Sequence, residues 1–483
     1  MGSISHLQPQ KVFGFFEEIC HIPHGSKNLQ QISDYFVKFA KDRNLEYVQD
    51  EALNVVIKKS ASAGYENCPP VIIQGHMDMV AVKKPDCTKD LKTEGITPMT
   101  DGISVWADGT SLGGDDGIAV AYAMAILDSD DIKHPALEVI ITTDEEIGME
   151  GAIALDVSDI KGRRMLNIDS EEEGDLLVSC AGGMRVACHL PIERENKTGL
   201  KYCLTIDGLQ GGHSGVEIHK ERGNANCILG RLLYELENVT DIQVISANGG
   251  LADNAIPRCA SLECVISKES KEVFEETIAN FEKDLKQELS SKDRDVFVKC
   301  KNLGACECEA LDKASTLKMA YLLLSVPNGV CAYSADIDGL VQTSLNLGML
   351  DLKEEELVLV FSVRSSLESE KRLLGQKLDA VTKLVGGYTV ASSEYPGWAY
   401  KEDSYLREHM KAVYKDMYGK DLNIVAIHAG LECGIFAGKL DGLDCVSFGP
   451  DLTDIHTTEE RMDVASVQRI WEFILKVLET MKE

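Results

Sequence analysis

Two hydrophobic patterns alternate along the first 180 residues of the chain. Short, continuous apolar runs occur at 69–75, 137–143 and 163–169. A longer stretch with helical character, residues 116–129, lies between the first two runs. This alternation is typical of βαβ units and predicts a mostly parallel sheet flanked by helices. In such sheets, ligands bind beyond the carboxyl ends of the strands.

The middle of the chain shows a different order of elements. From about residue 198 we expect strand, helix, strand, strand, helix and strand up to residue 300, which is the order of a split βαβ unit. After a predicted linker at 302–310, residues 314–394 repeat this order but lack a clear first strand. The middle therefore predicts two related α+β units.

The α/β pattern returns near the end of the chain, with apolar runs at 422–430 and 443–449 and an amphipathic helix at 465–481. A chain of 483 residues is also too long for one ordinary hydrophobic core. We therefore predict one α/β domain made of residues 1–185 and 396–483, interrupted by an inserted domain at 186–395.

Net charge, hydropathy and cysteine content limit the kinds of binding partner and the cellular location that we expect for the protein. The formal charge is 49 − 79 = −30, which repels nucleic-acid backbones and anionic membranes. The start of the chain has no basic leader before an apolar core, and no run of 18 apolar residues follows. Fifteen cysteines, an odd number lying within apolar runs and without a CxxC pair, favour reduced thiols over disulfides or a cysteine-bound zinc ion. The expected location is the cytoplasm.

Potential metal ligands follow the predicted strands of the α/β domain. They are His76 and Asp78, Glu145 and Glu146, Asp169 and His456, with Asp115 at the start of a predicted helix. A cluster of solvated acids is the alternative for any one of these groups, but several strand ends carrying ligands form a more specific signal. Mixed His and carboxylate ligation suits zinc, and an Asp that bridges two ions is a common two-metal arrangement.

Spacing suggests how these groups divide their roles. Residues two apart in an extended segment point to the same side, so Asp78 is placed to accept the second ring N–H of His76. Neighbours in an extended chain point apart, so Glu145 and Glu146 are not expected to ligate the same ion. One of the two is then free for other work.

Several motifs along the whole chain resemble the bacterial aminoacyl-histidine dipeptidases, a branch of the di-zinc peptidase family that includes carnosinases. They are GHMDMV, SLGGDDG, TTDEEIGMEGA, NIDSEEEG, GGHSG, DNAIPR, IHAGLECG and HTTEE, in this order. The resemblance implies a zinc-exopeptidase-like α/β catalytic domain with an inserted α+β lid. It also implies a cytoplasmic dipeptidase acting on Xaa-His and related unblocked dipeptides, including β-alanyl-histidine.

The resemblance implies a role for each matching residue. The two Zn²⁺ ions per chain, replaceable by Co²⁺ or Mn²⁺, would be held by His76, Asp115, Glu146, Asp169 and His456, with Asp115 as the bridge. Glu145 would be the general base that works on zinc-activated water, Asp78 would orient His76, and His213 would reach from the lid toward the substrate. Substrate-binding roles fall to Asn254, Arg364, His428 and Gly430.

One departure from the family pattern leaves the bridge open. Close relatives have an amide after the bridging Asp, whereas this chain has Asp116 there, so either Asp115 or Asp116 could bridge. Two other functions also stay open: an amidohydrolase or deacylase of N-acyl amino acids, and a catalytically silent binding protein of the same fold. The expected partners are small peptides, and the resemblance favours a homodimer.

Overall fold

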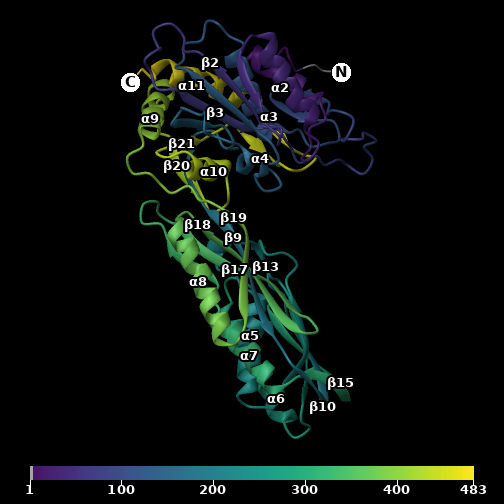
Figure 1. Ribbon diagram of the computed structural model, residues 1–483. Coiled ribbons are helices and arrows are strands. Elements are labelled where there is room, and N and C mark those ends of the chain that lie inside the picture. The colour runs from purple at the N-terminus through teal and green to yellow at the C-terminus, as the bar shows by residue number, and fades with distance from the viewer. Residues whose placement is uncertain (1–3, 483) are drawn as a thin grey trace. The chain divides into compact units, whose positions relative to one another are not determined.

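The computed structural model describes residues 4–482, which form two compact units (Figure 1). Unit 1 comprises the chain up to Cys180, Trp398–Ala426 and the chain from Leu431 on. Unit 2 comprises Ala181–Gly397 and Ile427–Gly430. The short segment Ile427–Gly430, which sequence analysis placed in the α/β domain, therefore belongs to unit 2. Within residues 4–482, no helix has the length and apolar character needed to cross a membrane.

Unit 1 is built around an eight-stranded sheet of order β1-β2-β6-β3-β7-β21-β8-β20. Its strands are β1 (Glu46–Gln49), β2 (Val55–Lys59), β3 (Val71–His76), β6 (Leu137–Thr142), β7 (Arg164–Asn167), β8 (Asp175–Cys180), β20 (Asn423–Ile427) and β21 (Asp444–Ser447). A smaller sheet contains β4 (Pro98–Thr100), β5 (Ser104–Ala107), β22 (Leu452–Thr453) and β23 (Arg461–Asp463). The helices are α1 (Gln10–Cys20), α2 (Gln30–Asp42), α3 (Gly114–Leu127), α4 (Glu150–Ala154), α9 (Tyr405–Tyr418), α10 (Glu432–Lys439) and α11 (Val464–Thr480).

The centre of the large sheet is parallel, as predicted. Strand β3 runs parallel to β6 and β7, and β7 runs parallel to β21. All residues of β3, β6 and β21 are buried, which explains why their sequences are continuous apolar runs without alternation. Because these strands point the same way, the segments that follow them meet at one edge of the sheet.

Helix α3 is apolar on every side because nearly all of it is buried. It packs against β3 and α1, and the Tyr122 hydroxyl donates to the Val467 carbonyl of α11 at 2.9 Å. This burial on all sides holds the first turn of α3, which carries Asp115 and Asp116, beside the carboxyl end of β3.

Unit 2 contains a nine-stranded antiparallel sheet whose main path is β15-β10-β14-β12-β17-β18-β9-β19, with β16 paired to β17. The strands are β9 (Gly182–Pro191), β10 (Arg194–Asp207), β12 (Gln243–Gly249), β14 (Ala260–Ile266), β15 (Phe297–Leu311), β16 (Gly329–Tyr333), β17 (Val341–Leu352), β18 (Glu356–Ser365) and β19 (Tyr388–Tyr395). A separate ribbon joins β11 (Gly212–His213) to β13 (Ala255–Ile256). The helical segments are η1 (Ile218–Lys220), α5 (Ala225–Glu237), α6 (Lys271–Glu288), α7 (Lys313–Ser325) and α8 (Glu368–Leu384).

The sheet order explains the first strand that the sequence lacked. One split βαβ unit is β10-α5-β12-β14-α6-β15, and the other is β9-α7-β17-β18-α8-β19. The first strand of the second unit, β9, precedes the whole first unit in the chain. The predicted linker at 302–310 was wrong, because these residues are part of β15 and pair with β10. Strand β15 is an exposed edge strand, so its polar sequence does not look like that of a buried strand.

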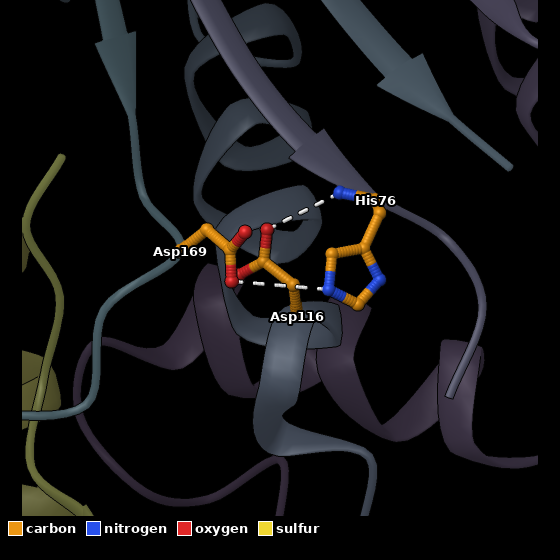
Figure 2. Close-up of side chains that lie close together, drawn as sticks. All are labelled: His76, Asp116 and Asp169. Carbon is orange, nitrogen blue, oxygen red and sulfur yellow. Dashed lines mark hydrogen bonds and ion pairs between the residues drawn. The ribbon is translucent and has the colours of Figure 1, made fainter. Parts of the chain in front are cut away.

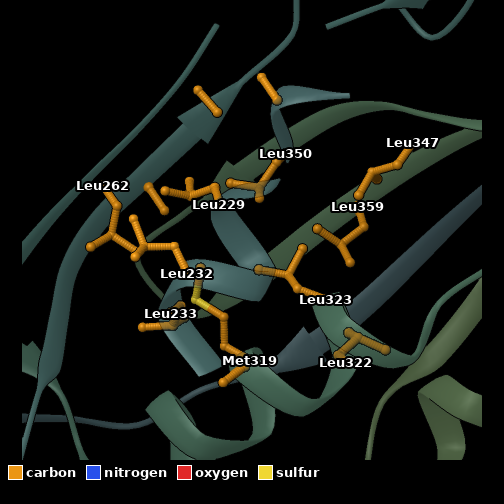
Figure 3. Close-up of a cluster of buried hydrophobic side chains, with 14 of the residues drawn as sticks. Leu229, Leu232, Leu233, Leu262, Met319, Leu322, Leu323, Leu347, Leu350 and Leu359 are labelled. Carbon is orange, nitrogen blue, oxygen red and sulfur yellow. The ribbon is translucent and has the colours of Figure 1, made fainter. Parts of the chain in front are cut away.

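A single hydrophobic core joins the two split units (Figure 3). Leucines of α5, Met319 of α7 and leucines of β14, β17 and β18 converge there. Helices α5 and α7 approach so closely that a Cβ on Gly230 would lie 2.5 Å from the Cβ of Leu323. Unit 2 is therefore one packed domain with two internal repeats, and its sheet presents its loops from a rigid base.

Candidate active site

Three parallel strands of unit 1 deliver side chains to one place. His76 is the last residue of β3, Asp169 lies two residues beyond β7, and Glu145 and Glu146 follow β6. Figure 2 shows His76 facing Asp169 and Asp116, with Asp116 coming from the start of α3. The sheet edge that the apolar runs predicted is thus the place where the acids and histidines gather.

Two overlapping groups of side chains have the geometry of a metal site. His76, Asp116 and Asp169 form one group, and His76, Asp115 and Glu146 form the other, each with ligand atoms within 4.8 Å of one another. The Nε2 atom of His76 lies 3.2 Å from Asp115 and 3.8 Å from Asp169. His76 is therefore shared by both groups.

Asp115 faces two histidines with two different oxygen atoms. Its Oδ1 lies 3.2 Å from His76 Nε2, and its Oδ2 lies 3.0 Å from His456 Nε2. Asp116 instead turns Oδ2 back to accept the backbone N–H of His76 at 3.2 Å. A Cβ on Gly75 would lie 2.5 Å from that oxygen, so glycine is needed in the motif GHMDMV. This arrangement supports Asp115, rather than Asp116, as the bridging carboxylate.

His456 comes from the loop between β22 and β23, far along the chain from the other groups. Its Nε2 lies 3.0 Å from both Asp115 and Glu146. The hydrogen bond to Asp115, together with the Glu146 carboxylate, raises the pKa of His456 to about 10. Asp115 and Asp78 likewise hold the pKa of His76 well above its usual value, although burial acts to lower it.

The spacing predicted that the Asp78 carboxylate accepts a hydrogen bond from His76, but this carboxylate also contacts two other segments. His76 Nδ1 lies 3.0 Å from the backbone carbonyl of Asp78 and 3.5 Å from its carboxylate, so the carbonyl is the closer acceptor. The carboxylate accepts the Ser26 hydroxyl at 2.8 Å and the backbone N–H of Glu145 at 3.0 Å. Asp78 therefore links the end of β3 to the turn that carries the paired glutamates.

The paired glutamates lie in a turn, so the expectation of an extended segment was wrong. The backbone N–H groups of Gly148 and Met149 both donate to the Glu145 carbonyl at 2.9 Å. The side chains nevertheless separate, because Glu146 joins a candidate metal group and Glu145 joins neither group. Burial, aided by repulsion from Glu432 and Glu146, raises the pKa of Glu145 to about 8.

Asp144, the acid before this pair, is not a freely solvated group. It accepts the backbone N–H of Lys27 at 2.7 Å, and Lys27 Nζ also reaches Glu150 at 2.6 Å. Among the acids after Asp169, Glu173 likewise forms a paired contact with Arg469 at 2.6 and 2.5 Å. Both acidic segments are therefore anchored to other elements of unit 1.

The donor set fits divalent metal ions. Burial and neighbouring carboxylates raise the pKa values of Asp116 and Asp169, which shows how strongly these acids repel one another. The buried Oε1 atom of Glu146 has no hydrogen-bond partner in residues 4–482, and the single nitrogen of His456 lies near two carboxylates. One ring proton cannot satisfy both acids, whereas a cation between them can.

Two buried glutamates that the sequence pattern did not single out support the site. Glu432, at the start of α10, accepts the Thr142 hydroxyl at 2.7 Å and the Gln74 amide at 2.5 Å, beneath the ends of β3 and β6. Burial raises the pKa of Glu432 to about 7. Glu460 accepts the backbone N–H groups of residues 112, 113 and 114 at 2.7, 3.1 and 2.8 Å. Both lie in quoted motifs, IHAGLECG and HTTEE, but nothing in the pattern showed that they are buried.

In unit 2, the fold fixes the ring of His213. Its Nδ1 accepts the backbone N–H groups of Gly215 and Val216, both at 3.2 Å. Burial and the positive charge of Arg364 lower the pKa of His213. The neutral ring therefore carries its hydrogen on Nε2, which makes that atom a donor.

The other predicted binding residues of unit 2 lie near His213. Asn254 accepts the backbone N–H of Ser214 at 2.8 Å through its carbonyl, and the Gly215 backbone packs on the His428 carbonyl. Gly430 ends the short segment that carries His428. His428 contacts the Ser344 hydroxyl at 2.7 Å, and burial together with Arg364 lowers its pKa to about 3.

Arg364 is the buried cation of this cluster. It lies on β18 opposite Ser344 of β17, and its Nη1 donates to the Tyr395 hydroxyl at 3.3 Å. Its Nε has no partner among the described residues, and none of their carboxylates forms an ion pair with it. A buried guanidinium with such an unused donor is suited to an anionic ligand.

Replacing Glu460 is expected to weaken metal binding, because the loop that carries Asp115 loses its three-fold backbone anchor. We predict that Glu460→Ala binds zinc about 10- to 100-fold more weakly, the scale for partners that orient ligands. Titration calorimetry on the metal-free protein measures this. The exposed neighbour Glu459, which pairs with Lys84, gives the matched control Glu459→Ala. Equal zinc affinity in both variants would show that the anchor has no part in the site.

Comparisons with known proteins agree over nearly the whole chain. The model of peptidase family M20/M25/M40 matches residues 72–480. The cytosol non-specific dipeptidase of Escherichia coli is 36% identical over 480 residues, covering 99% of each chain. The crystal structure of aminoacylhistidine dipeptidase from Vibrio alginolyticus is 36% identical, with a TM-score of 0.94 over 99% of this chain and 98% of that one.

A more distant structure, the aminopeptidase PepT from Bacillus cereus, shares the fold at 16% identity and a TM-score of 0.56, over 99% of this chain and 100% of that one. The high-identity matches confirm the α/β fold class and the resemblance that the motifs indicated. The chain belongs to peptidase family M20/M25/M40 and is an enzyme that hydrolyses peptide bonds.

Proposed function

We propose that the chain is a metal-dependent dipeptidase that hydrolyses Xaa-His and related unblocked dipeptides, including β-alanyl-histidine. The observation that carries the proposal is the pair of ligand groups around His76, with the half-buried Glu145 beside them and outside both. The printed names of the two relatives at 36% identity, a non-specific dipeptidase and an aminoacylhistidine dipeptidase, support the substrate class. The name of the first supports a cytoplasmic location.

Five side chains would hold two divalent ions, with zinc as the first candidate. They are His76, Asp115, Glu146, Asp169 and His456. When bound, such ions supply Lewis-acid chemistry, which polarises a peptide carbonyl and makes water more acidic. Asp115 suits the bridge because its two oxygens face different histidines. Cobalt or manganese would bind the same mixed nitrogen and oxygen set.

Glu145 is positioned to move the proton. Its backbone N–H donates to Asp78, and its half-buried side chain belongs to neither ligand group. As water attacks the scissile carbonyl, Glu145 takes a proton from it and then delivers that proton to the leaving amine. Its raised pKa of about 8 reflects a carboxyl that holds a proton more readily than an exposed glutamate does.

Unit 2 would recognise the carboxylate end of the dipeptide. Arg364 offers a buried guanidinium without a carboxylate partner among residues 4–482, and His213 offers an Nε2–H donor. A free carboxylate satisfies both kinds of donor. Asn254 contacts the loop of His213 and His428 contacts Ser344, and Gly430 ends the segment that carries His428. A homodimer stays a prediction.

The proposed function is tested by the release of histidine. The zinc-loaded protein is expected to split β-alanyl-histidine and alanyl-histidine into free amino acids, measured by chromatography. A chelator should abolish the reaction and added zinc should restore it, because the carboxylates need the cations to act. Cleavage of N-acetyl-histidine in preference to these dipeptides would instead favour a deacylase, and binding without any turnover would favour a silent binding protein.

Exchanging each of the paired glutamates separates proton transfer from metal binding. We predict that Glu145→Gln keeps its metal content but loses about 10²- to 10⁴-fold in kcat, the usual contribution of a general base. Glu146→Gln should lose metal first, because its carboxylate belongs to a ligand group. Metal analysis beside kcat checks both. A metal-free Glu145→Gln together with a fully loaded Glu146→Gln would reverse the assignment.

His213 is expected to matter for turnover but not for metal binding. His213→Ala removes the fixed Nε2–H donor, so we predict a loss of about 10²-fold or more in kcat with unchanged zinc content, the scale for one lost oxyanion donor. The exposed His219 of η1 lies in the same loop region and provides the control His219→Ala. Near-normal turnover in His213→Ala would refute the role.

A further inference from the structure

A pocket of about 720 Å³ opens beside Glu146 and lies wholly in unit 1. Its wall is formed by the segment from Gly25 to Asn28, by residues around Met79 and by Ile147. This segment lies between α1 and α2, and none of the roles described above uses it. The pocket therefore adjoins the candidate metal site and shares Glu146 with it.

The pocket is tied rigidly to the catalytic residues. Ser26 donates to the Asp78 carboxylate at 2.8 Å, and the backbone N–H of Lys27 donates to Asp144 at 2.7 Å. Asp78 also holds the backbone of Glu145. The same hydrogen bonds that set the position of the glutamate turn therefore set the position of the pocket wall.

The lining combines an apolar surface with basic groups. Met79, Val80, Leu91 and Ile147 supply apolar side chains, and three lysines stand among them, at 27, 83 and 92. Lys83 and Lys92 are exposed to solvent, so their ammonium groups are accessible to a ligand in the pocket. Its chemistry suits a side chain with an apolar stem and an anionic tip.

Two of these lysines have no carboxylate partner within the described part of the chain. Lys27 pairs with Glu150 at 2.6 Å, so the positive charge of its ammonium group is already neutralised. Lys83 donates only to the Lys89 carbonyl, at 2.5 Å, and Lys92 makes no ion pair there. Two acids also line the pocket, Asp90 and Glu146. Glu146 belongs to a candidate metal group, and Asp90 accepts the backbone N–H of Lys92 and the Thr93 hydroxyl, both at 3.1 Å, within its own turn.

We propose that this pocket receives the side chain of the residue on the amino side of the scissile bond and selects an acidic side chain over a basic one. The inference rests on the proposed function. The assignment follows from unit 1 alone: the pocket is lined by Glu146 of a candidate metal group, and its wall is tied through Asp78 to the backbone of Glu145, so a side chain held there lies next to the groups that act on the scissile bond. Lys83 and Lys92 attract a glutamate carboxylate and repel a lysine ammonium group.

The test compares the kcat/KM values of the zinc-loaded enzyme for Glu-His, Gln-His and Lys-His. The wild type should prefer Glu-His over Lys-His by roughly 3- to 10-fold at low salt, the scale of partly exposed charge pairs. The double variant Lys83→Glu, Lys92→Glu should reverse this order. Raising the salt concentration should reduce the preference in both proteins, because the interacting charges are exposed to solvent.

A matched control separates a local effect from the effect of net charge. Lys420 is exposed and lies between α9 and β20, the edge strand on the other side of the large sheet. Lys420→Glu should keep the wild-type ratio of Glu-His to Lys-His. If the double variant does not fold, Lys92→Glu alone carries the test, since its ammonium group makes no ion pair within residues 4–482.

The outcomes distinguish the two proposals. An unchanged ratio in a folded, metal-loaded lysine variant that still cleaves Gln-His would overturn the acidic subsite and leave the dipeptidase intact. A wild type that prefers Lys-His would overturn it as well. A wild type that cleaves none of the three dipeptides would defeat the proposed function itself.

Discussion

The repulsion among buried carboxylates at the carboxyl edge of the large sheet is the constraint on which the site depends. Asp115, Asp116 and Asp169 are held close to His76, and two of these acids have strongly raised pKa values because burial and their neighbours disfavour their charge. Such a cluster is stable only if positive charge balances it. Protonated histidines or metal cations can do this, and the geometry suits cations because single nitrogens face several oxygens.

The rest of unit 1 can be understood as the support that holds these charges in place. The buried helix α3 fixes Asp115 and Asp116, Glu460 anchors the loop before them, and Asp78 connects β3 to the glutamate turn. Each support satisfies backbone N–H groups that the loops would otherwise leave unpaired. Precise positioning therefore comes from hydrogen bonds between segments far apart in the sequence, rather than from the ligands alone.

Unit 2 has a different arrangement, in which the neutral ring of His213 lies near the buried guanidinium of Arg364. The backbone N–H groups at Gly215 and Val216 fix the ring of His213, and the charge of Arg364 disfavours its protonation. The two split βαβ units share one core, so the loops that carry these groups rest on a single sheet. The proposed recognition of a carboxylate rests on residues of unit 2, and the proposed proton transfer rests on Glu145 of unit 1.

The sequence by itself determined the parallel sheet, the gathering of candidate metal ligands at its edge and the family. It could do so because buried parallel strands need continuous apolar runs, and the residues after them must meet at one edge. Only the tertiary structure decided the remaining points. Strand β9 lies far before the repeat it completes, the edge strand β15 is polar, and Glu145 lies in a turn. Such features depend on pairing between distant segments and on burial, and the local hydrophobic periodicity of the sequence shows neither of these. For the same reason, the roles of Glu432 and Glu460 became visible only when their distant partners were known.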